Sequence, residues 1–150
     1  MIFKFRILSS ESDDFLLDVE LSYDSTLLDF NALLQKTLDY NPSEMTSFFK
    51  SDVEWEKFQE YTLFDMGVEI DPDEYEDFEE DEIPLAPIAM SDALLGKIIT
   101  ERFDRLIYVF DLFNERELYI ELIETKEAEP GHTYPRVAEL TAKPPKQFND

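Results

Sequence analysis

The stretch from residue 105 to 125 constrains the fold of this 150-residue chain more than any other. Two runs of apolar and aromatic residues meet at Asn114-Glu115, and apolar side chains recur at every second position, as in β-strands. If these two residues form the loop, Val109 lies opposite Ile120, so apolar side chains meet across the pair. Glutamate is a poor second residue for so tight a turn, so a longer loop stays open. The pattern predicts an antiparallel hairpin in the middle of a sheet, because an edge position would expose several aromatic side chains.

Aromatic side chains share one face of this hairpin in the two-residue register. Phe110 lies opposite Tyr119, and Tyr108 points to the same side. We interpret the stripe as core, with a ligand or partner surface as the alternative. Asp111 points to the other face beside apolar residues, so it must be hydrogen-bonded, lie near the end of the sheet, or act in a pocket that raises its pKa. The structural alternative pairs it with an arginine: Arg102, Arg105 or Arg136.

The first forty residues predict two strands followed by a helix. Residues 2–8 and 15–23 alternate apolar with charged or polar side chains around a polar turn, which indicates a hairpin with one solvated face. Thr26 is a suitable helix N-cap, with Asp29 three residues later. The helix should end near Tyr40, because an Asn-Pro pair follows. The helix side chains expected to face water are Asn31, Gln35 and Asp39.

The remaining segments predict shorter elements. Residues 45–50 and 60–64 are expected to be strands, whereas two prolines in residues 83–90 argue against a regular helix or a central strand there. Ser91 is a suitable N-cap for a short helix. Residues 127–150 contain several prolines, so we expect an irregular tail. Together the elements predict an α+β fold: a single-domain β-grasp-like roll over residues 1–150, with a mixed or antiparallel sheet, a central hairpin and one main helix packed across it.

Charge is the strongest compositional feature. The chain carries 36 acidic and 13 basic residues, a net charge of −23, and residues 69–82 hold ten carboxylates in fourteen positions. Such a block repels itself and is expected to be a flexible acidic loop. The negative electrostatic field of the chain argues against direct nucleic-acid binding and favours a basic protein partner. The alternative is that the charge serves only to keep the protein soluble. The candidate contacts in this loop are Asp73, Glu76 and Asp77.

The residue types limit the chemistry. The chain has no cysteine, one histidine and three glycines, which excludes thiol catalysis and leaves no Gly-rich phosphate loop. Asp71, Asp73 and Glu82 match three positions of a calcium loop, but Glu76 stands where the sharp turn requires glycine. We therefore predict no metal, no cofactor and no catalysis. No apolar run is long enough to span a membrane, and a cytoplasmic location is the expectation.

Several short motifs occur in a familiar order. They are the two N-terminal strands and the helix after Thr26, Met45-Thr46-Ser47-Phe48-Phe49, Tyr108-Val109-Phe110-Asp111 with the glutamates of the next strand, Glu129-Pro130-Gly131, Tyr134-Pro135-Arg136, and Pro144-Pro145. In this the chain resembles the Ri-plasmid open-reading-frame-three-like family, whose members are also labelled insertion-sequence passenger or TnpR-like proteins.

The resemblance implies an α+β roll of bacterial origin with no established activity. Many members carry a Tyr-Asp-Phe-Gly-Asp turn, where this chain has residues 110–114, Phe-Asp-Leu-Phe-Asn. Val137 stands where some members have a cysteine, so no metal or thiol role is carried over. The TnpR-like label points to recombination.

Three functions follow from these observations. The first is a non-catalytic binding or interaction module with an acidic surface. The second is a small-ligand or enzymatic site on the aromatic face near Asp111, which would need a deep pocket lined by Tyr108, Phe110 and Tyr119. The third is an accessory protein of a mobile genetic element.

Overall fold

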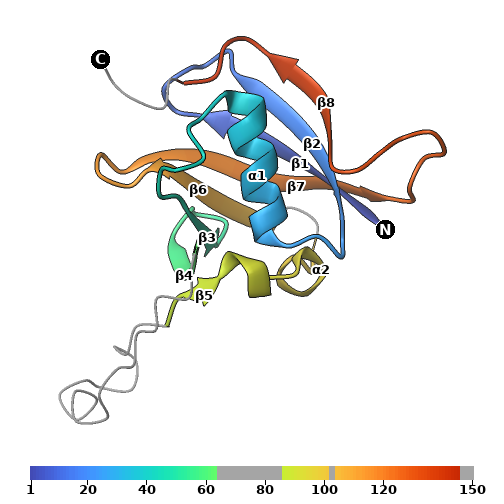
Figure 1. Cartoon of the computed structure of the whole chain (residues 1–150), viewed down its shortest axis with the longest axis horizontal. Coiled ribbons are helices and arrows are strands. Elements are labelled where there is room, and N and C mark those ends of the chain that lie inside the picture. The colour runs from blue at the N-terminus through green and yellow to red at the C-terminus, as the bar shows by residue number, and fades with distance from the viewer. Residues whose placement is uncertain (64–85, 102–103, 146–150) are drawn as a thin grey trace.

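A single sheet organises the molecule in its computed structural model, which describes residues 1–63, 86–101 and 104–145. Within these residues eight strands lie in the order β5-β4-β3-β6-β7-β1-β2-β8, and only the β4–β5 pair is parallel (Figure 1). This is an α+β architecture. The strands are β1 Ile2–Ser9, β2 Leu16–Ser22, β3 Ser47–Ser51, β4 Lys57–Thr62, β5 Ile88–Ala89, β6 Arg105–Asp111, β7 Arg116–Lys126 and β8 Arg136–Thr141.

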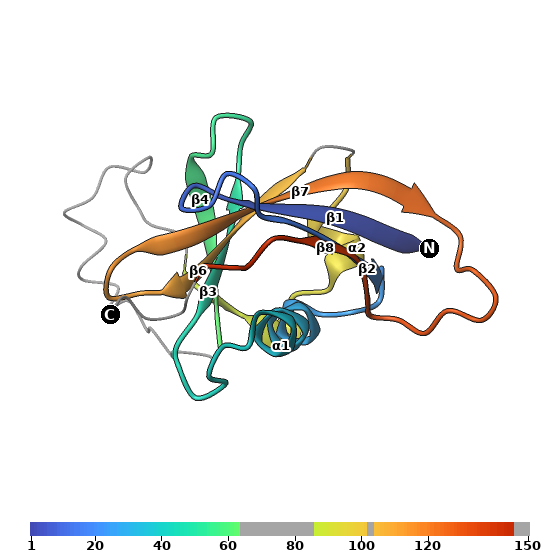
Figure 2. The same ribbon diagram turned by 90° about the horizontal axis from the view of Figure 1, so that it is seen from above.

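Helix α1, Leu27–Leu38, lies across one face of the sheet, and Figure 2 shows it nearly end-on beneath the strands. The predicted N-cap is confirmed: Asp29 N donates to Thr26 Oγ1 at 3.2 Å, and Thr26 N donates to Asp29 Oδ2 at 2.9 Å. The ring of Phe30 lies 5.1 Å from that of Phe5 and 5.4 Å from that of Phe48. The core therefore forms between α1 and the middle strands.

The polar stripe of α1 is not solvated as expected. Asn31 and Gln35 are only 3% and 7% exposed. Asn31 Oδ1 accepts hydrogen bonds from Thr46 Oγ1 at 2.8 Å and from the Tyr108 hydroxyl at 2.7 Å, and its Nδ2 lies 3.3 Å from Gln35 Oε1. Burial of Asn31 is tolerated because these partners satisfy its side chain. Of the three residues predicted to face water, Asp39 is exposed.

Strands β6 and β7 form the predicted central hairpin, between β3 and β1. The predicted register is wrong, because Leu106, three positions before Val109, lies opposite Ile120. The loop has four residues, 112–115, and Glu115 adopts a positive φ of 55°. A β-bulge between Val109 and Asp111 adds a further shift. The longer loop therefore replaces the two-residue turn.

The change of register moves side chains between faces. Side chains alternate along a strand, so a shift of an odd number of residues reverses which faces meet. Tyr108 lies opposite Leu118 on the α1 side, whereas Tyr119 lies opposite Ile107 on the other side. Phe110 also belongs to the core beneath α1. The predicted single face of Tyr108, Phe110 and Tyr119 does not exist.

The predicted N-terminal hairpin is confirmed, but its charged face is not fully solvated. Strands β1 and β2 pair from Ile2 opposite Ser22 to Leu8 opposite Leu16. Asp18 on the polar face is only 1% exposed. Arg6 of β1 donates two hydrogen bonds of 3.0 Å to its carboxylate, and β8 pairs with the outer edge of β2.

A strand that directly follows a proline forms each edge of the sheet. The tail prediction for residues 127–150 is wrong over β8, which pairs antiparallel with β2. Prolines flank this six-residue strand and do not interrupt it, so each residue keeps its backbone donor. Within residues 83–90, Ile88–Ala89 follow the second proline and pair with β4 at the edge of the sheet, which agrees with the expectation that no central strand forms there. The predicted strands at 45–50 and 60–64 correspond to β3 and β4 with shifted bounds.

The helical segment before β6 begins later than predicted. A 3₁₀ turn covers Met90–Asp92, and α2 covers only Leu95–Ile98, with Leu94 and not Ser91 at its N-cap. A Cβ on Gly96 would lie 2.6 Å from Tyr23 Cδ2 and 2.9 Å from Tyr23 O. Glycine therefore allows α2 to approach β2 closely. In the described part of the chain, no helix is long and apolar enough to cross a membrane.

Candidate functional site

Two of the three aromatic residues proposed for a ligand site, Tyr108 and Phe110, fill the core. Tyr108 and Phe110 are 0% and 1% exposed. The Tyr108 ring packs 4.8 Å from Phe48, and Phe110 stacks on Tyr40 at 5.1 Å. Burial raises the pKa of the Tyr108 hydroxyl far above its ordinary value. The interpretation of this stripe as core is therefore confirmed for Tyr108 and Phe110, and the deep pocket that the alternative required is filled by side chains.

Tyr119 belongs to a separate cluster on the face away from α1. The Trp55 indole meets its ring edge-on at 5.1 Å. The Arg105 guanidinium lies 4.6 Å from the Trp55 ring, and its Nε lies 3.3 Å from a carboxylate oxygen of Glu121. Figure 2 shows the β3–β4 loop, which carries Trp55, rising from this face of the sheet. Trp55 thus covers apolar surface that the sheet would otherwise expose.

Asp111 is a structural residue of the hairpin end. It accepts hydrogen bonds from Asn114 N at 3.2 Å and Asn114 Nδ2 at 2.9 Å. These bonds are the main cause of its lowered pKa, and Arg116 at 3.7 Å also contributes. The alternative with a raised pKa is therefore wrong. The arginine partner is Arg116 because the observed register places it opposite Asp111, and the predicted register did not.

Arg116 ties this hairpin end to the β1–β2 loop. Its Nη2 and Nε donate to the Glu11 carboxylate at 2.7 Å and 3.1 Å. Its guanidinium lies 4.7 Å from the Phe110 ring, which stacks on Tyr40 at the end of α1. The bonds to Glu11 are the largest cause of the raised pKa of Arg116. The β1–β2 loop, the end of β6 and the residues after α1 therefore all pack at the base of the β6–β7 loop.

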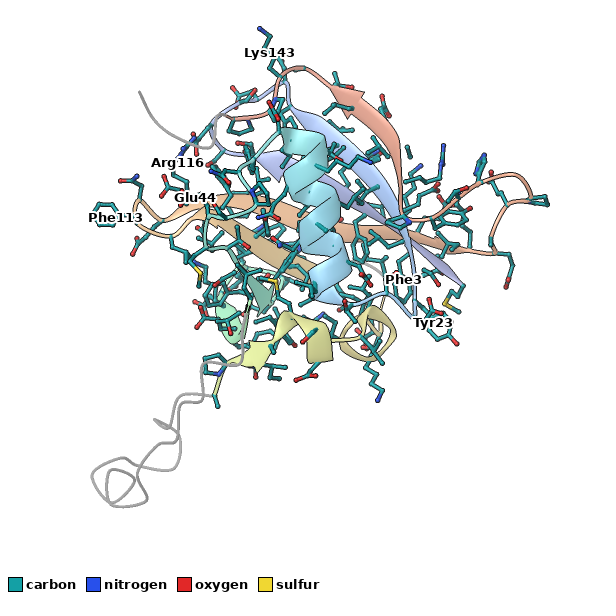
Figure 3. All side chains as sticks on the ribbon, viewed as in Figure 1. Phe3, Tyr23, Glu44, Phe113, Arg116 and Lys143 are labelled. Atoms are coloured by element: carbon teal, nitrogen blue, oxygen red, sulfur yellow. The ribbon has the colours of Figure 1, made fainter. Side chains whose placement is uncertain are left out.

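The hairpin tip, residues 112–115, presents apolar side chains to solvent. Phe113 is 95% exposed and Leu112 is 40% exposed. Figure 3 shows Phe113 projecting from one end of the molecule, beyond Arg116. The two-residue loop expected at Asn114-Glu115 would leave Phe113 within a strand, so it did not mark Phe113 as a surface residue. A four-residue loop would have identified it.

Ion pairs occupy many of the basic side chains. Arg6 pairs with Asp18 at 3.0 Å, and the 1% exposed Glu20 pairs with both Lys126 and Arg136. Hydrogen bonds from the two cations lower the pKa of Glu20 against the effect of burial. The seven paired basic residues are Arg6, Lys50, Lys57, Arg105, Arg116, Lys126 and Arg136.

Many exposed carboxylates have no such counter-charge among the ion pairs of the described residues. They lie on several loops and strands, so the excess negative charge is spread over the surface. They include Asp13, Asp14, Asp24, Asp52, Glu54, Glu56, Asp92, Glu115, Glu124 and Glu127. The proposed contacts Asp73, Glu76 and Asp77, and the expected loop over 69–82, lie outside the described residues. In the described ranges, no cluster of histidine, aspartate or glutamate side chains could hold a metal ion.

A hollow of about 510 Å³ lies at the opposite end of the molecule from the hairpin tip. Figure 3 shows Phe3 and Tyr23 at that end. Buried apolar side chains form its floor, and polar groups lie at its rim. The lining residues are Met1, Phe3, Tyr23, Gly96, Ile99, Thr100, Glu101, Leu122 and Thr125. No pattern in the sequence brought these residues together in advance.

Comparisons with known proteins place the chain in a family. No curated protein sequence matches it. A solved structure of a protein of unknown function, MM3350 from Methanosarcina mazei Go1, is similar in fold, with a TM-score of 0.68 and 12% sequence identity. The similarity covers 93% of this chain and 68% of that one. The sequence model of the plasmid pRiA4b ORF-3-like proteins matches residues 2–149, so this chain belongs to that family.

Proposed function

We propose that this protein is a non-catalytic interaction module that binds a basic partner protein through its acidic surface. The observation that carries the proposal is the unequal use of its charges. Of the eleven lysine and arginine side chains in the described residues, seven are held in ion pairs with described carboxylates, several of them half-buried or buried, such as Glu20. Exposed carboxylates then dominate the surface that a partner meets. Such a surface attracts cationic proteins and repels phosphate backbones.

The acidic segment strengthens this attraction through its composition. Residues 69–82 hold ten of the 36 carboxylates and no lysine or arginine. We propose Asp73, Glu76 and Asp77 as contacts for the basic partner. Charge complementarity of this kind acts mainly on the association rate, and salt screens it over roughly 10 Å at 0.1 M.

The test compares the wild type with a variant whose ten carboxylates in residues 69–82 are changed to the matching amides. This variant keeps the length and shape of every side chain. Proteins captured from the cells that carry the gene are identified for both, and the association rate of each purified candidate is measured at rising salt. We expect the variant to lose the partner and the wild-type rate to fall steeply with salt. An unchanged set of captured proteins, or a rate that salt does not alter, contradicts the proposal.

A second candidate function is binding of a small molecule in the hollow beside Phe3 and Tyr23. Its volume lies in the range of about 300–1,000 Å³ typical of ligand sites, and it combines an apolar floor with hydroxyl and carboxylate groups. Because Glu101 is the only charged side chain among the described residues that line it, we propose that neutral or cationic aromatic compounds fit better than anionic ones. Titration with benzylamine and with benzoate, followed by NMR, tests this. Equal or absent shifts at Tyr23 and Thr125 with the two probes contradict it.

We also propose a fold relationship and a cellular role. A β-grasp-like relationship is supported by the order strand, strand, helix at the start of the chain, with the helix across the sheet. A role as an accessory protein of a mobile genetic element in the bacterial cytoplasm is supported by the plasmid reference in the family name.

A further inference from the structure

We propose that Phe113 is the residue by which this protein anchors itself in an apolar pocket of its partner, and that lysine or arginine side chains border that pocket. This rests on the proposed interaction function. Charge attraction alone does not fix where the partner binds, and Phe113 would provide one specific contact point.

The first argument is the exposure of Phe113. Its side chain is 95% exposed, whereas Tyr108 and Phe110 in the same hairpin are almost completely buried. A phenylalanine side chain that becomes buried at an interface removes roughly 150–250 Å² from water. The neighbouring Leu112, 40% exposed, extends the apolar surface of the tip. The tip thus offers the kind of aromatic projection that dominates binding energy at interfaces.

The second argument is that the base of the tip is held in place before any partner binds. Asp111 accepts two hydrogen bonds from Asn114 across the loop. Arg116, at the other end of the loop, binds Glu11 and lies over the Phe110 ring. A loop that is fixed in advance loses little conformational entropy on binding. Ordinary packing needs do not explain why so constrained a loop presents an aromatic ring to water.

The third argument is the charge around the tip, which selects the partner. Glu11, Asp111 and Glu115 stand against one arginine, Arg116. Arg116 is only 8% exposed, whereas Glu115 and Glu11 are exposed. A partner that approaches Phe113 therefore meets the carboxylate of Glu115 in the same loop and those of Asp111 and Glu11 at its base. A pocket with a cationic border satisfies them, and one with an acidic border or a second copy of this acidic chain does not.

Site-specific photo-crosslinking tests the contact. The photoreactive residue p-benzoylphenylalanine is placed at position 113 of the full chain, and at Val53 as a control, in the cells that carry the gene. Val53 is also an exposed apolar residue of a hairpin loop, at 74% exposure, but lies between β3 and β4. We expect one heterologous protein to be crosslinked at 113 and not at 53. Equal adducts at both positions, no adduct, or an adduct with the chain itself overturns the proposal.

The crosslinked protein is then purified and titrated with Phe113→Ala, Phe113→Leu and Val53→Ala. Loss of an aromatic anchor should raise Kd roughly 30-fold or more for Phe113→Ala, less for Phe113→Leu, and not for Val53→Ala. Circular dichroism and Tm check that the variants fold, which the exposure of both side chains favours. An unchanged Kd for Phe113→Ala refutes the anchor.

Salt separates this inference from the proposed function. If Phe113→Ala leaves Kd unchanged but binding still weakens with salt, the anchor is wrong and the acidic interaction stands. If Phe113→Ala weakens binding and salt does not, the anchor stands and the electrostatic function is wrong.

Discussion

Asn31 joins α1 to the sheet through buried hydrogen bonds, and its replacement by leucine should destabilise the protein by about 2–5 kcal/mol. Leucine is similar in size but cannot accept the bonds that Thr46 and Tyr108 donate at 2.8 Å and 2.7 Å. Both donor residues are 0% exposed, so water cannot replace the lost acceptor. A buried hydroxyl left without a partner costs about 1–3 kcal/mol, and two are affected.

A double-mutant cycle isolates this cause. Tyr108→Phe alone should cost about 1 kcal/mol, because Asn31 keeps the bond from Thr46. In Asn31→Leu the same change removes one of the unpaired hydroxyls. The double variant should therefore be more stable than the sum of the single effects by about 1–2 kcal/mol.

Urea unfolding followed by circular dichroism provides the free energies. Lys36→Leu, at an exposed position of α1, is the control for adding leucine to the helix. Single effects for Asn31→Leu and Tyr108→Phe that add within about 0.5 kcal/mol would refute the reasoning, since they would show that the two side chains act independently.

Three other perturbations have expected outcomes. Gly96→Ala should lower the stability by about 1–3 kcal/mol, measured as a lower Tm, because the added Cβ would lie too close to Tyr23. Adding Tyr23→Ala should not restore the Tm, because the backbone oxygen of residue 23, 2.9 Å from that Cβ, remains. An unchanged Tm for Gly96→Ala would contradict this close approach. Arg116→Met should cost about 1–2 kcal/mol in urea unfolding, a figure kept low because the Glu11 side chain is 35% exposed; an unchanged midpoint would count against the ion pair. Asp111 has a lowered pKa in the folded protein, so its contribution exists above the unfolded value of about 3.9 and is lost as pH falls through the lower folded value. Asp111→Asn should therefore make stability less dependent on pH below about pH 4, and identical pH profiles from urea midpoints would disprove that.

Local signals predicted α1 and the N-terminal hairpin because short-range chemistry determines them. The Thr26 and Asp29 pair forms its hydrogen bonds within one turn, so spacing alone identifies the helix start. The burial of Asn31 depends on Thr46 and Tyr108, which are distant in sequence. Helical periodicity cannot report such partners.

The central hairpin was predictable as a pair but not in its register. Apolar alternation is satisfied by several alignments, and the loop length decides among them. Glu115 adopts the left-handed backbone conformation, which glycine and asparagine adopt more readily than glutamate. The longer loop turned Phe113 outward and separated Tyr119 from Phe110. Phe113 is therefore a candidate contact residue only because the loop is longer than the predicted two-residue turn.

Strand order also bears on how the chain can be synthesised. Strand β1 begins at the second residue, yet one of its two neighbours is β7, which ends at Lys126. A growing chain cannot complete the middle of the sheet until this late segment has left the ribosome. Before then, β2 and α1 can assemble only on one side of β1, whose other hydrogen-bonding edge stays open. Cellular chaperones are thus expected to encounter an open sheet edge while the residues between β1 and β7 are being translated.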